Sequence, residues 1–441
     1  MIKNAIQKEY IEYRRSPLRT FIFIYLCGTL TLDSFLGYIL KYKGLQEDIL
    51  FHPGQIIRSL LLIFLIISFF GKKRTFFPKW ETIIFFLMLY FSLFLFALYF
   101  VKGYSYFLNE IINISKVLFL FLIAYYIGNN KRYFENKLPL IININFIVFS
   151  FNLLIGYFSE VGLKTYAYIE YSSKGFYYGG NIVSVLGIVF LTYYLFKYRL
   201  SLYSIPAVVL SIFNLYVAAT KTLFIVPFVF LVFFMKSLIP LNKMPIKIIK
   251  YSPAFLILIT LGFYSYSFMS RSDNIERDIF ASVERSYRIY ERRERVTNFF
   301  LVEPFEMITY RRIFAAKEQV IESVKHPIYL MFGIGKAGQE EFWIKQGSSY
   351  HDASMDFFDI QFQYGLIGLI IISYPIMKIL FSLLRNKNKD FLIISFIIMF
   401  FYSFFGGHVI ESTTSGTFFG LFIGLLYMDK GRKYNENPRC M

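Results

Sequence analysis

The chain has 441 residues, of which 56% are hydrophobic and 21% aromatic, and its mean hydropathy is +0.51. These values exclude an ordinary soluble globular protein and predict a polytopic membrane protein. The formal net charge is +18, but the basic residues gather in short segments between apolar runs, where they set membrane orientation and meet anionic headgroups. We therefore expect no nucleic acid partner. Cys27 and Cys440 lie far apart in the sequence and imply no disulfide framework.

Apolar runs long enough to cross about 30 Å of hydrocarbon recur along the whole chain. The sequence predicts an all-α polytopic membrane protein with about 12 transmembrane helices and one long helical loop. We expect the spans at 18–40, 54–70, 82–101, 107–128, 138–158, 179–196, 201–219, 222–238, 253–269, 357–381, 391–405 and 417–428. The first run, LRTFIFIYLCGTLTLDSFLGYIL, is too long for a secretory signal and should remain in the mature protein.

Basic residues near span ends predict the orientation, because Lys and Arg in short loops are retained in the cytoplasm. The basic clusters lie at 3–19, 72–74, 131–137, 197–199, 236–250, 385–389 and 430–439. Both termini are therefore expected to be cytoplasmic and the long loop to lie outside. The expected domains are a transmembrane bundle of about nine helices at 1–269, a loop domain at 270–355, transmembrane helices at 356–428 and a cytoplasmic tail at 429–441.

Three charged residues fall inside predicted spans: Asp33, Arg58 and Lys116. Intramembrane charges mark either an ion path or mutual pairing within the bundle. We favour pairing.

The long loop is predicted to be helical. The segment DNIERDIFASVERSYRIYERRERVTNFF carries charges of both signs at helical spacings without Pro or Gly, and YRRIFAAKEQVIESV repeats the pattern. The second helix should stop at His326-Pro327, because proline disfavours a helical residue before it. Gly333, Gly335 and Gly338 follow in a predicted turn-rich loop, where glycines permit positive φ and close backbone approach.

A stripe of polar residues opens the next span. Asp352, Asp356, Asp359 and Gln363 are spaced i, i+4, i+7 and i+11, so on a helix they share one face. Because carboxylates cannot face lipid, we expect the stripe to line a polar vestibule open to the outside. The stripe could also coordinate a divalent cation. One helix face does not complete a coordination shell, however, and His52, His326 and His408 show no ligand spacing with it, so we expect no metal.

The segment from Arg312 to Gly368 resembles the shared region of bacterial O-antigen polymerases and O-antigen ligases. That region contains an arginine, a helix, a His-Pro pair, a Gly-x-Gly loop, a His-Asn pair and a span that opens with Gly-x-x-Gly. The matching residues are Arg312, His326-Pro327, Gly333 and Gly335, His351-Asp352, and Gly365 with Gly368. Upstream, FYYGGNIVSVLGIVF resembles the family's span start at Asn181, and AATKTLFIVPF resembles its Thr-Lys element at Lys221. Two positions depart from the family: Ala316 stands where a tryptophan is usual, and Asp352 replaces the common asparagine.

The resemblance implies a GT-C type membrane glycosyltransferase of lipopolysaccharide biosynthesis in the bacterial inner membrane, inverting, metal-independent and without a cofactor. The resemblance also implies that the long loop is periplasmic. Donor and acceptor would both be undecaprenyl-diphosphate-linked oligosaccharide, and the further partners would be membrane lipid and a chain-length regulator protein. The implied site consists of His351 and Asp352 as catalytic residues, Arg312, Arg311 and Lys221 on the diphosphate, and Asn181 and Asp356 in contact with substrate.

The residue types suit this chemistry. Arginine grips phosphate bidentately, and histidine is the usual general base near neutral pH. Each residue also has a structural interpretation. His351 could be a hydrogen-bonded surface residue, Arg311 and Arg312 could pair with Glu306 or Glu318, Lys221 could snorkel to the interface, and Asn181 could cap a helix.

Three functions remain open at this stage. We favour an O-antigen polymerase, which joins repeat units into polysaccharide. The first alternative is an O-antigen ligase, which transfers finished glycan to the lipid A core. The second is a flippase or transporter of lipid-linked sugars. The long outer loop favours an enzyme, and the halves show no internal hydropathy repeat of the kind on which many transporters are built.

Overall fold

The computed structural model describes residues 16–43, 53–71, 79–159, 161–165, 172–177, 179–198, 204–218, 226–227, 229–230, 233, 312–346, 353–384 and 391–426. Within these ranges the secondary structure is helical and contains no strand. The helices are α2 (Pro17–Lys43), α3 (Pro53–Phe70), α4 (Lys79–Lys102), α5 (Tyr104–Asn129), α6 (Lys131–Phe158), α7 (Gly180–Tyr198), α8 (Ile205–Val217), α13 (Arg312–Lys325), α14 (Pro327–Phe332), α15 (Gly335–Lys345), α16 (Asp356–Leu384), α17 (Phe391–Phe405) and α18 (Thr413–Leu426).

Six of these helices, α2, α4, α5, α6, α7 and α16, are long and apolar enough to cross a membrane. The helices α3, α8, α17 and α18 are apolar but shorter. Each of these ten helices coincides with a predicted span. The predicted spans 222–238 and 253–269 lie wholly or almost wholly outside the described residues. The membrane character is therefore supported, and the count of about 12 spans stays a prediction.

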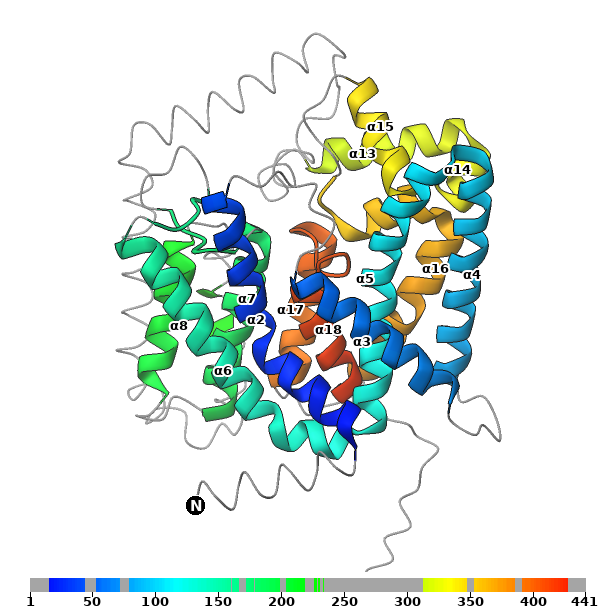
Figure 1. The fold of residues 1–441 in the computed structure, drawn as a ribbon. Helices are drawn as coiled ribbons and strands as arrows, with labels where there is room; N and C mark the ends of the chain where they lie inside the picture. Colours follow the sequence, from blue (N-terminus) through cyan, green and yellow to red (C-terminus); the bar gives the residue numbers. More distant parts are fainter. Residues whose placement is uncertain are drawn as a thin grey trace, which may run out of the picture. The chain divides into compact units, whose positions relative to one another are not determined.

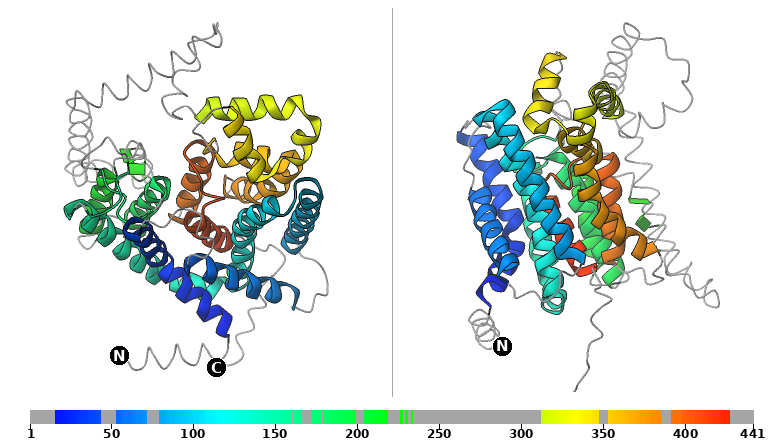
Figure 2. Two further views of the ribbon diagram at one scale, coloured as in Figure 1. Left: turned by 45° about the horizontal axis from the view of Figure 1, so that its top comes forward. Right: turned by 90° about the vertical axis from the view of Figure 1, so that its right-hand side faces the viewer.

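Two compact units make up the chain. One unit comprises residues 1–149 and 314–441, and the other comprises residues 150–313. In the first unit the C-terminal helices pack with the N-terminal ones: α18 lies against α5 and α2, and α4 lies beside both α5 and α16 (Figures 1 and 2). In the second unit α7 packs against α8.

Glycines bring α18 close to α5. Gly420 and Gly424 are one helical turn apart, and a Cβ on Gly420 would lie 2.9 Å from the Leu120 carbonyl oxygen. A Cβ on Gly424 would lie 2.6 Å from the carbonyl oxygen of Ala124. This is the small-residue packing by which membrane helices approach one another closely.

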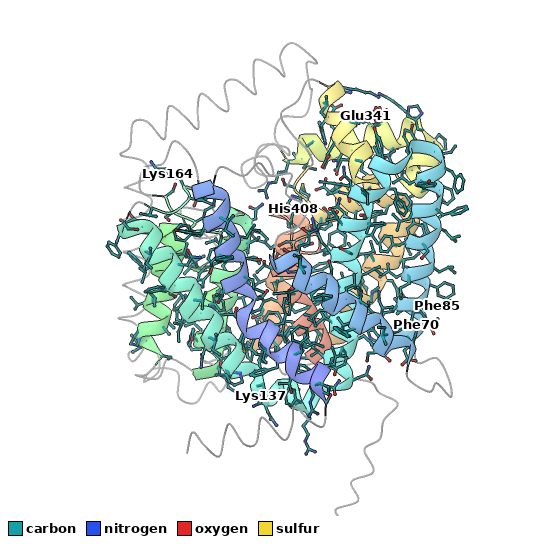
Figure 3. All side chains as sticks on the ribbon, in the orientation of Figure 1. Phe70, Phe85, Lys137, Lys164, Glu341 and His408 are labelled. Atoms are coloured by element: carbon teal, nitrogen blue, oxygen red, sulfur yellow. The ribbon has the colours of Figure 1, made fainter. Side chains whose placement is uncertain are left out.

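The outer surface of the first unit is apolar. Phe70 on α3 and Phe85 on α4 point outward (Figure 3), and they are 53% and 40% exposed. Contiguous exposed aromatic and aliphatic side chains of this kind indicate a face that contacts lipid.

Polar segments of the first unit divide between its two ends. The Arg19 guanidinium lies 4.4 Å from the Tyr133 ring centroid, and the Lys137 ammonium lies 5.3 Å from that of Phe23. Arg19 and Lys137 therefore lie at the same end of this unit. Lys137 and Glu341 of α15 lie at opposite ends (Figure 3).

The helical prediction for the second half of the loop is confirmed. Helix α13 ends at Lys325, directly before His326-Pro327, where the sequence predicts the stop. Pro327 is the first residue of α14, a position that tolerates its missing N–H. The first predicted loop helix, 273–300, lies outside the described residues.

Candidate functional site

A buried carboxylate network surrounds the start of α16. The Asp359 carboxylate accepts four hydrogen bonds, from Gln319 Nε2 of α13 at 3.1 Å, Gln339 Nε2 of α15 at 2.6 Å, and the backbone N–H groups of Ala353 and Met355 at 2.9 Å each. Asp359 is completely buried, and a buried carboxylate is tolerated only with such partners. Asp359 thus anchors α13, α15 and the turn at residues 353–355 to α16.

Asp356, the first residue of α16, is held on one side only. Its Oδ2 accepts hydrogen bonds from Ser403 Oγ at 2.5 Å and from the backbone N–H groups of Val409 and Ile410 at 2.7 and 2.8 Å. Its Oδ1 is buried, accepts no hydrogen bond and lies 3.7 Å from His408 Nδ1. Three donors to Oδ2 therefore fix the plane of the carboxylate, and Oδ1 faces His408.

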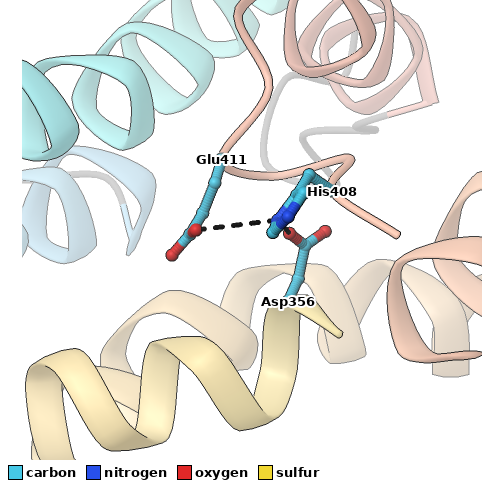
Figure 4. A group of neighbouring side chains, drawn as sticks. All are labelled: Asp356, His408 and Glu411. Carbon is cyan, nitrogen blue, oxygen red and sulfur yellow. Dashed lines mark ion pairs between the residues drawn. The ribbon is translucent and has the colours of Figure 1, made fainter. Parts of the chain in front are cut away.

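His408 and Glu411 come from the loop between α17 and α18 (Figure 4). His408 Nδ1 lies 3.8 Å from Glu411 Oε2, and the side chains of His408 and Glu411 are 27% and 14% exposed. Burial raises the pKa of Glu411 to about 7, an effect that Lys336 and His408 oppose and that Asp359 and Asp356 reinforce.

A second polar layer connects α16 with α15 and α5. Gln363 Nε2 donates to Gln339 Oε1 at 2.8 Å, and Lys336 Nζ donates to the same oxygen at 3.3 Å. The backbone N–H of Lys336 donates to Glu110 Oε2 of α5 at 2.6 Å. Lys336 is near the start of α15, where a carboxylate is favoured by the helix dipole.

Two glycines let α14 touch α16 backbone to backbone. Gly333 (φ 78°, ψ −179°) and Gly365 (φ 65°, ψ −177°) occupy a region that is essentially restricted to glycine. A Cβ on Gly333 would lie 2.1 Å from the Gln363 carbonyl oxygen, and a Cβ on Gly365 would lie 2.2 Å from that of Met331. Gly365 also interrupts the helical geometry of α16. The predicted close approach at Gly333 is confirmed, but the prediction of a turn-rich loop through Gly338 was wrong, because helix α15 begins at Gly335 and contains Gly338.

The vestibule prediction was wrong for the described part of the stripe. Asp356, Asp359 and Gln363 do share one side of α16, but all three are completely buried. Protein atoms enclose these side chains, and no water-lined opening reaches them. Helices α13 and α15 contact Asp359 and Gln363, and α17 with the α17–α18 loop contacts Asp356. Helical periodicity cannot reveal these contacts.

Sequence spacing linked no histidine to this stripe, but the structure places His408 beside Asp356. His408 is far from Asp356 in the sequence, so spacing gave no ligand pattern, yet tertiary packing brings their side chains together. Glu411 was not singled out at all. A usable signal was present: GGHVIES places two titratable residues in a short turn between apolar runs, in a chain with only four histidines.

Arg312 and Asn181, both candidate site residues, meet in the second unit. Arg312 Nη2 donates to Asn181 Oδ1 at 3.4 Å. Asn181 is the second residue of the membrane-length helix α7. The guanidinium is therefore at the beginning of an apolar helix. Four other candidates, Arg311, Lys221, His351 and Asp352, lie outside the described residues.

Ala316 departs from the resembling family, and its surroundings contain a tryptophan. Ala316 is 1% exposed and belongs to a small apolar cluster with Ala315, Trp343, Ala353 and Met355. Trp343 of α15 is 5% exposed. A tryptophan from α15 thus packs beside the alanine of α13.

The pairing prediction for intramembrane charges is confirmed for Arg58 and Asp33. Arg58 Nη2 lies 2.5 Å from Asp33 Oδ1, and Arg58 Nε donates to Tyr25 Oη at 3.0 Å. Lys116 Nζ instead donates to Asn113 Oδ1 at 3.1 Å, one turn away on α5.

Searches with this sequence matched no protein-family model and no curated protein.

Proposed function

We propose that this chain is an O-antigen polymerase of the GT-C type. It joins undecaprenyl-diphosphate-linked oligosaccharide repeat units into polysaccharide at the periplasmic face of the bacterial inner membrane. Both termini are cytoplasmic, and the 270–355 loop domain is periplasmic.

The anchoring of residues 353–355 supports the proposal most directly. Ala353 directly follows His351-Asp352, the proposed catalytic pair, and both Ala353 and Met355 donate their backbone N–H groups to Asp359. A catalytic residue needs a rigid support that fixes its position. The buried Asp359 supplies such support at the junction of a membrane helix with the loop helices.

This junction suits a substrate whose lipid tail lies in the bilayer and whose sugars lie in water. Arg19 and Lys137 lie at the end of the first unit opposite Glu341. Since basic ends are cytoplasmic, α13–α15 and the start of α16 belong on the outer side.

The proposed reaction is a direct displacement. The acceptor sugar's hydroxyl oxygen bonds to the anomeric carbon of the donor, and its proton passes to the His351 imidazole. The bond from that carbon to the diphosphate oxygen breaks, and undecaprenyl diphosphate leaves with the electron pair, which inverts the configuration. Asp352 orients the imidazole.

Cationic side chains stabilise the leaving diphosphate. Arg312 offers a planar fork that matches two phosphate oxygens, and Asn181 holds that fork at the beginning of α7. Arg311 and Lys221 add positive charge. Stabilisation of charge that develops in the transition state is usually the largest catalytic contribution.

The test is deletion of the gene followed by gel electrophoresis of lipopolysaccharide. A polymerase deletion leaves one repeat unit on the core, which is the expected result. Complete loss of repeat units from the core, with accumulation of lipid-linked polymer, would indicate a ligase. Trapping of single units on the cytoplasmic side would indicate a flippase. Either of these last two outcomes would overturn the proposal.

A further inference from the structure

Asp356, His408 and Glu411 form a group of metal-binding side chains from two separate elements. Asp356 opens α16, and the other two lie in the loop between α17 and α18. One potential ligand atom from each lies within 4.8 Å of the other two. Among the described residues, this is the group of three or more His, Cys, Asp or Glu side chains whose ligand atoms all lie within that distance of one another.

Asp356 shows a feature independent of this proximity. It is 0% exposed, and its Oδ1 accepts no hydrogen bond while Oδ2 accepts three. A buried carboxylate oxygen without a donor costs free energy. A cation at Oδ1 would remove that cost, and the three bonds to Oδ2 are the outer contacts that orient a metal-binding carboxylate.

The distances suit a small ion after minor side-chain rotation. Two ligand atoms about 2.1 Å from a tetrahedral ion lie about 3.4 Å apart. The His408 Nδ1 distances to Asp356 Oδ1 and Glu411 Oε2 are 3.7 and 3.8 Å. His408 and Glu411 lie on a loop, and Glu411 Oε2, which accepts a hydrogen bond from Gln363 Nε2 at 3.5 Å, would rotate toward the fixed Asp356 to bind the ion.

The donor atoms select the class of ion. Mg²⁺ and Ca²⁺ prefer oxygen ligands throughout. An imidazole nitrogen with two carboxylates suits a divalent transition metal, of which Zn²⁺ is the reference. With three protein ligands the ion keeps a position open to water.

We propose that Asp356, His408 and Glu411 bind one divalent transition-metal ion that fastens the α17–α18 loop to the first turn of α16. The site is distinct from the cationic residues proposed for the diphosphate, and it does not depend on the glycosyltransferase assignment.

The experiment uses the full-length protein purified in detergent, with its affinity tag removed and its metals stripped by a chelator. Zn²⁺ is titrated in competition with a chromogenic indicator, and retained zinc is counted by mass spectrometry after desalting. The wild type should retain one ion per chain, and excess Mg²⁺ should not displace it. His408→Ala and Glu411→Gln should each weaken binding at least about tenfold.

His326→Ala is the matched control. His326 is also a histidine close to a carboxylate, with Nε2 3.5 Å from Glu322 Oε1, but its side chain is exposed. Its zinc affinity should equal that of the wild type. Glu411→Gln keeps the size and shape of the side chain, so it provides the test of zinc binding if His408→Ala misfolds and does not elute as a single species. The proposal is overturned if the wild type retains no zinc, if Glu411→Gln binds zinc as the wild type does, or if excess Mg²⁺ displaces the zinc.

Discussion

Substituting Gly365 by alanine should destabilise the junction of α14 with α16. The residue has φ 65° and ψ −177°, and a non-glycine residue held in such a region costs about 1–3 kcal/mol. The added Cβ would lie 2.2 Å from the Met331 carbonyl oxygen, so the two backbones must separate. The neighbouring bond from Ile334 N to Phe362 O, now 3.1 Å, would then be lost at about 0.5–1.5 kcal/mol. The expected loss is about 1.5–4.5 kcal/mol in all.

The apparent Tm of purified protein in detergent measures this loss. Gly365→Ala should lower it by about 2–5 °C in a chain of 441 residues. Gly28→Ala is the matched control: Gly28 lies within α2, and a Cβ there would meet nothing within 4 Å. Alanine in a helix interior is favoured over glycine by about 0.5–1 kcal/mol, so that Tm should stay or rise.

A double variant tests whether the two glycines act as one contact. Gly333 and Gly365 face the same pair of backbones. Once one alanine has separated them, the second should cost less, with a coupling of about 0.5–3 kcal/mol. If Gly365→Ala had the apparent Tm of Gly28→Ala, the backbone contact between α14 and α16 would be refuted.

Four further predictions concern the site and the topology. Arg312→Lys keeps the charge but loses the bidentate fork, so polymer on a lipopolysaccharide gel should largely disappear; normal polymer would return Arg312 to a structural role. His351→Ala should lower the reaction rate by roughly 10²–10⁴ and so abolish visible polymer while the protein level stays normal. His326→Ala should instead give polymer in proportion to the amount of protein that accumulates. Unchanged polymer in His351→Ala would show that His351 is not the base. Asp359→Asn removes the charge that four donors share and should cost about 2–3 kcal/mol, seen as a lower apparent Tm in detergent; an unchanged Tm would argue against its anchoring role. An alkaline-phosphatase fusion near residue 300 should be active, and an inactive one would contradict a periplasmic loop.

Much of the helical framework followed from local sequence patterns. Hydropathy placed ten helices, and His326-Pro327 placed the end of α13, because apolar length and proline sterics act within a single segment. The Arg58–Asp33 pair was also expected, since a charge inside an apolar bundle needs a partner. These inferences need no knowledge of which helices are neighbours.

The candidate metal site could not be predicted in this way. Asp356 and His408 meet only because α16 and α17 pack together, a relation that no periodicity in one segment encodes. The burial of Asp359 and Gln363 depends likewise on contacts with α13 and α15. The Gly416-x-x-x-Gly420-x-x-x-Gly424 pattern of α18 was visible in the sequence, but its partner helix was not.

The packing of α18 against α5 sets an order for biogenesis. Leu120 is synthesised 300 residues before its contact Gly420, and at about 5–20 residues per second this takes about 15–60 s. Until then, the surface of α5 that α18 later covers has no permanent neighbour in the bilayer. The membrane insertion machinery or transient lipid contacts must shield it during that interval. A nascent chain that stops before α18 therefore presents an incomplete bundle to the membrane's quality-control proteases.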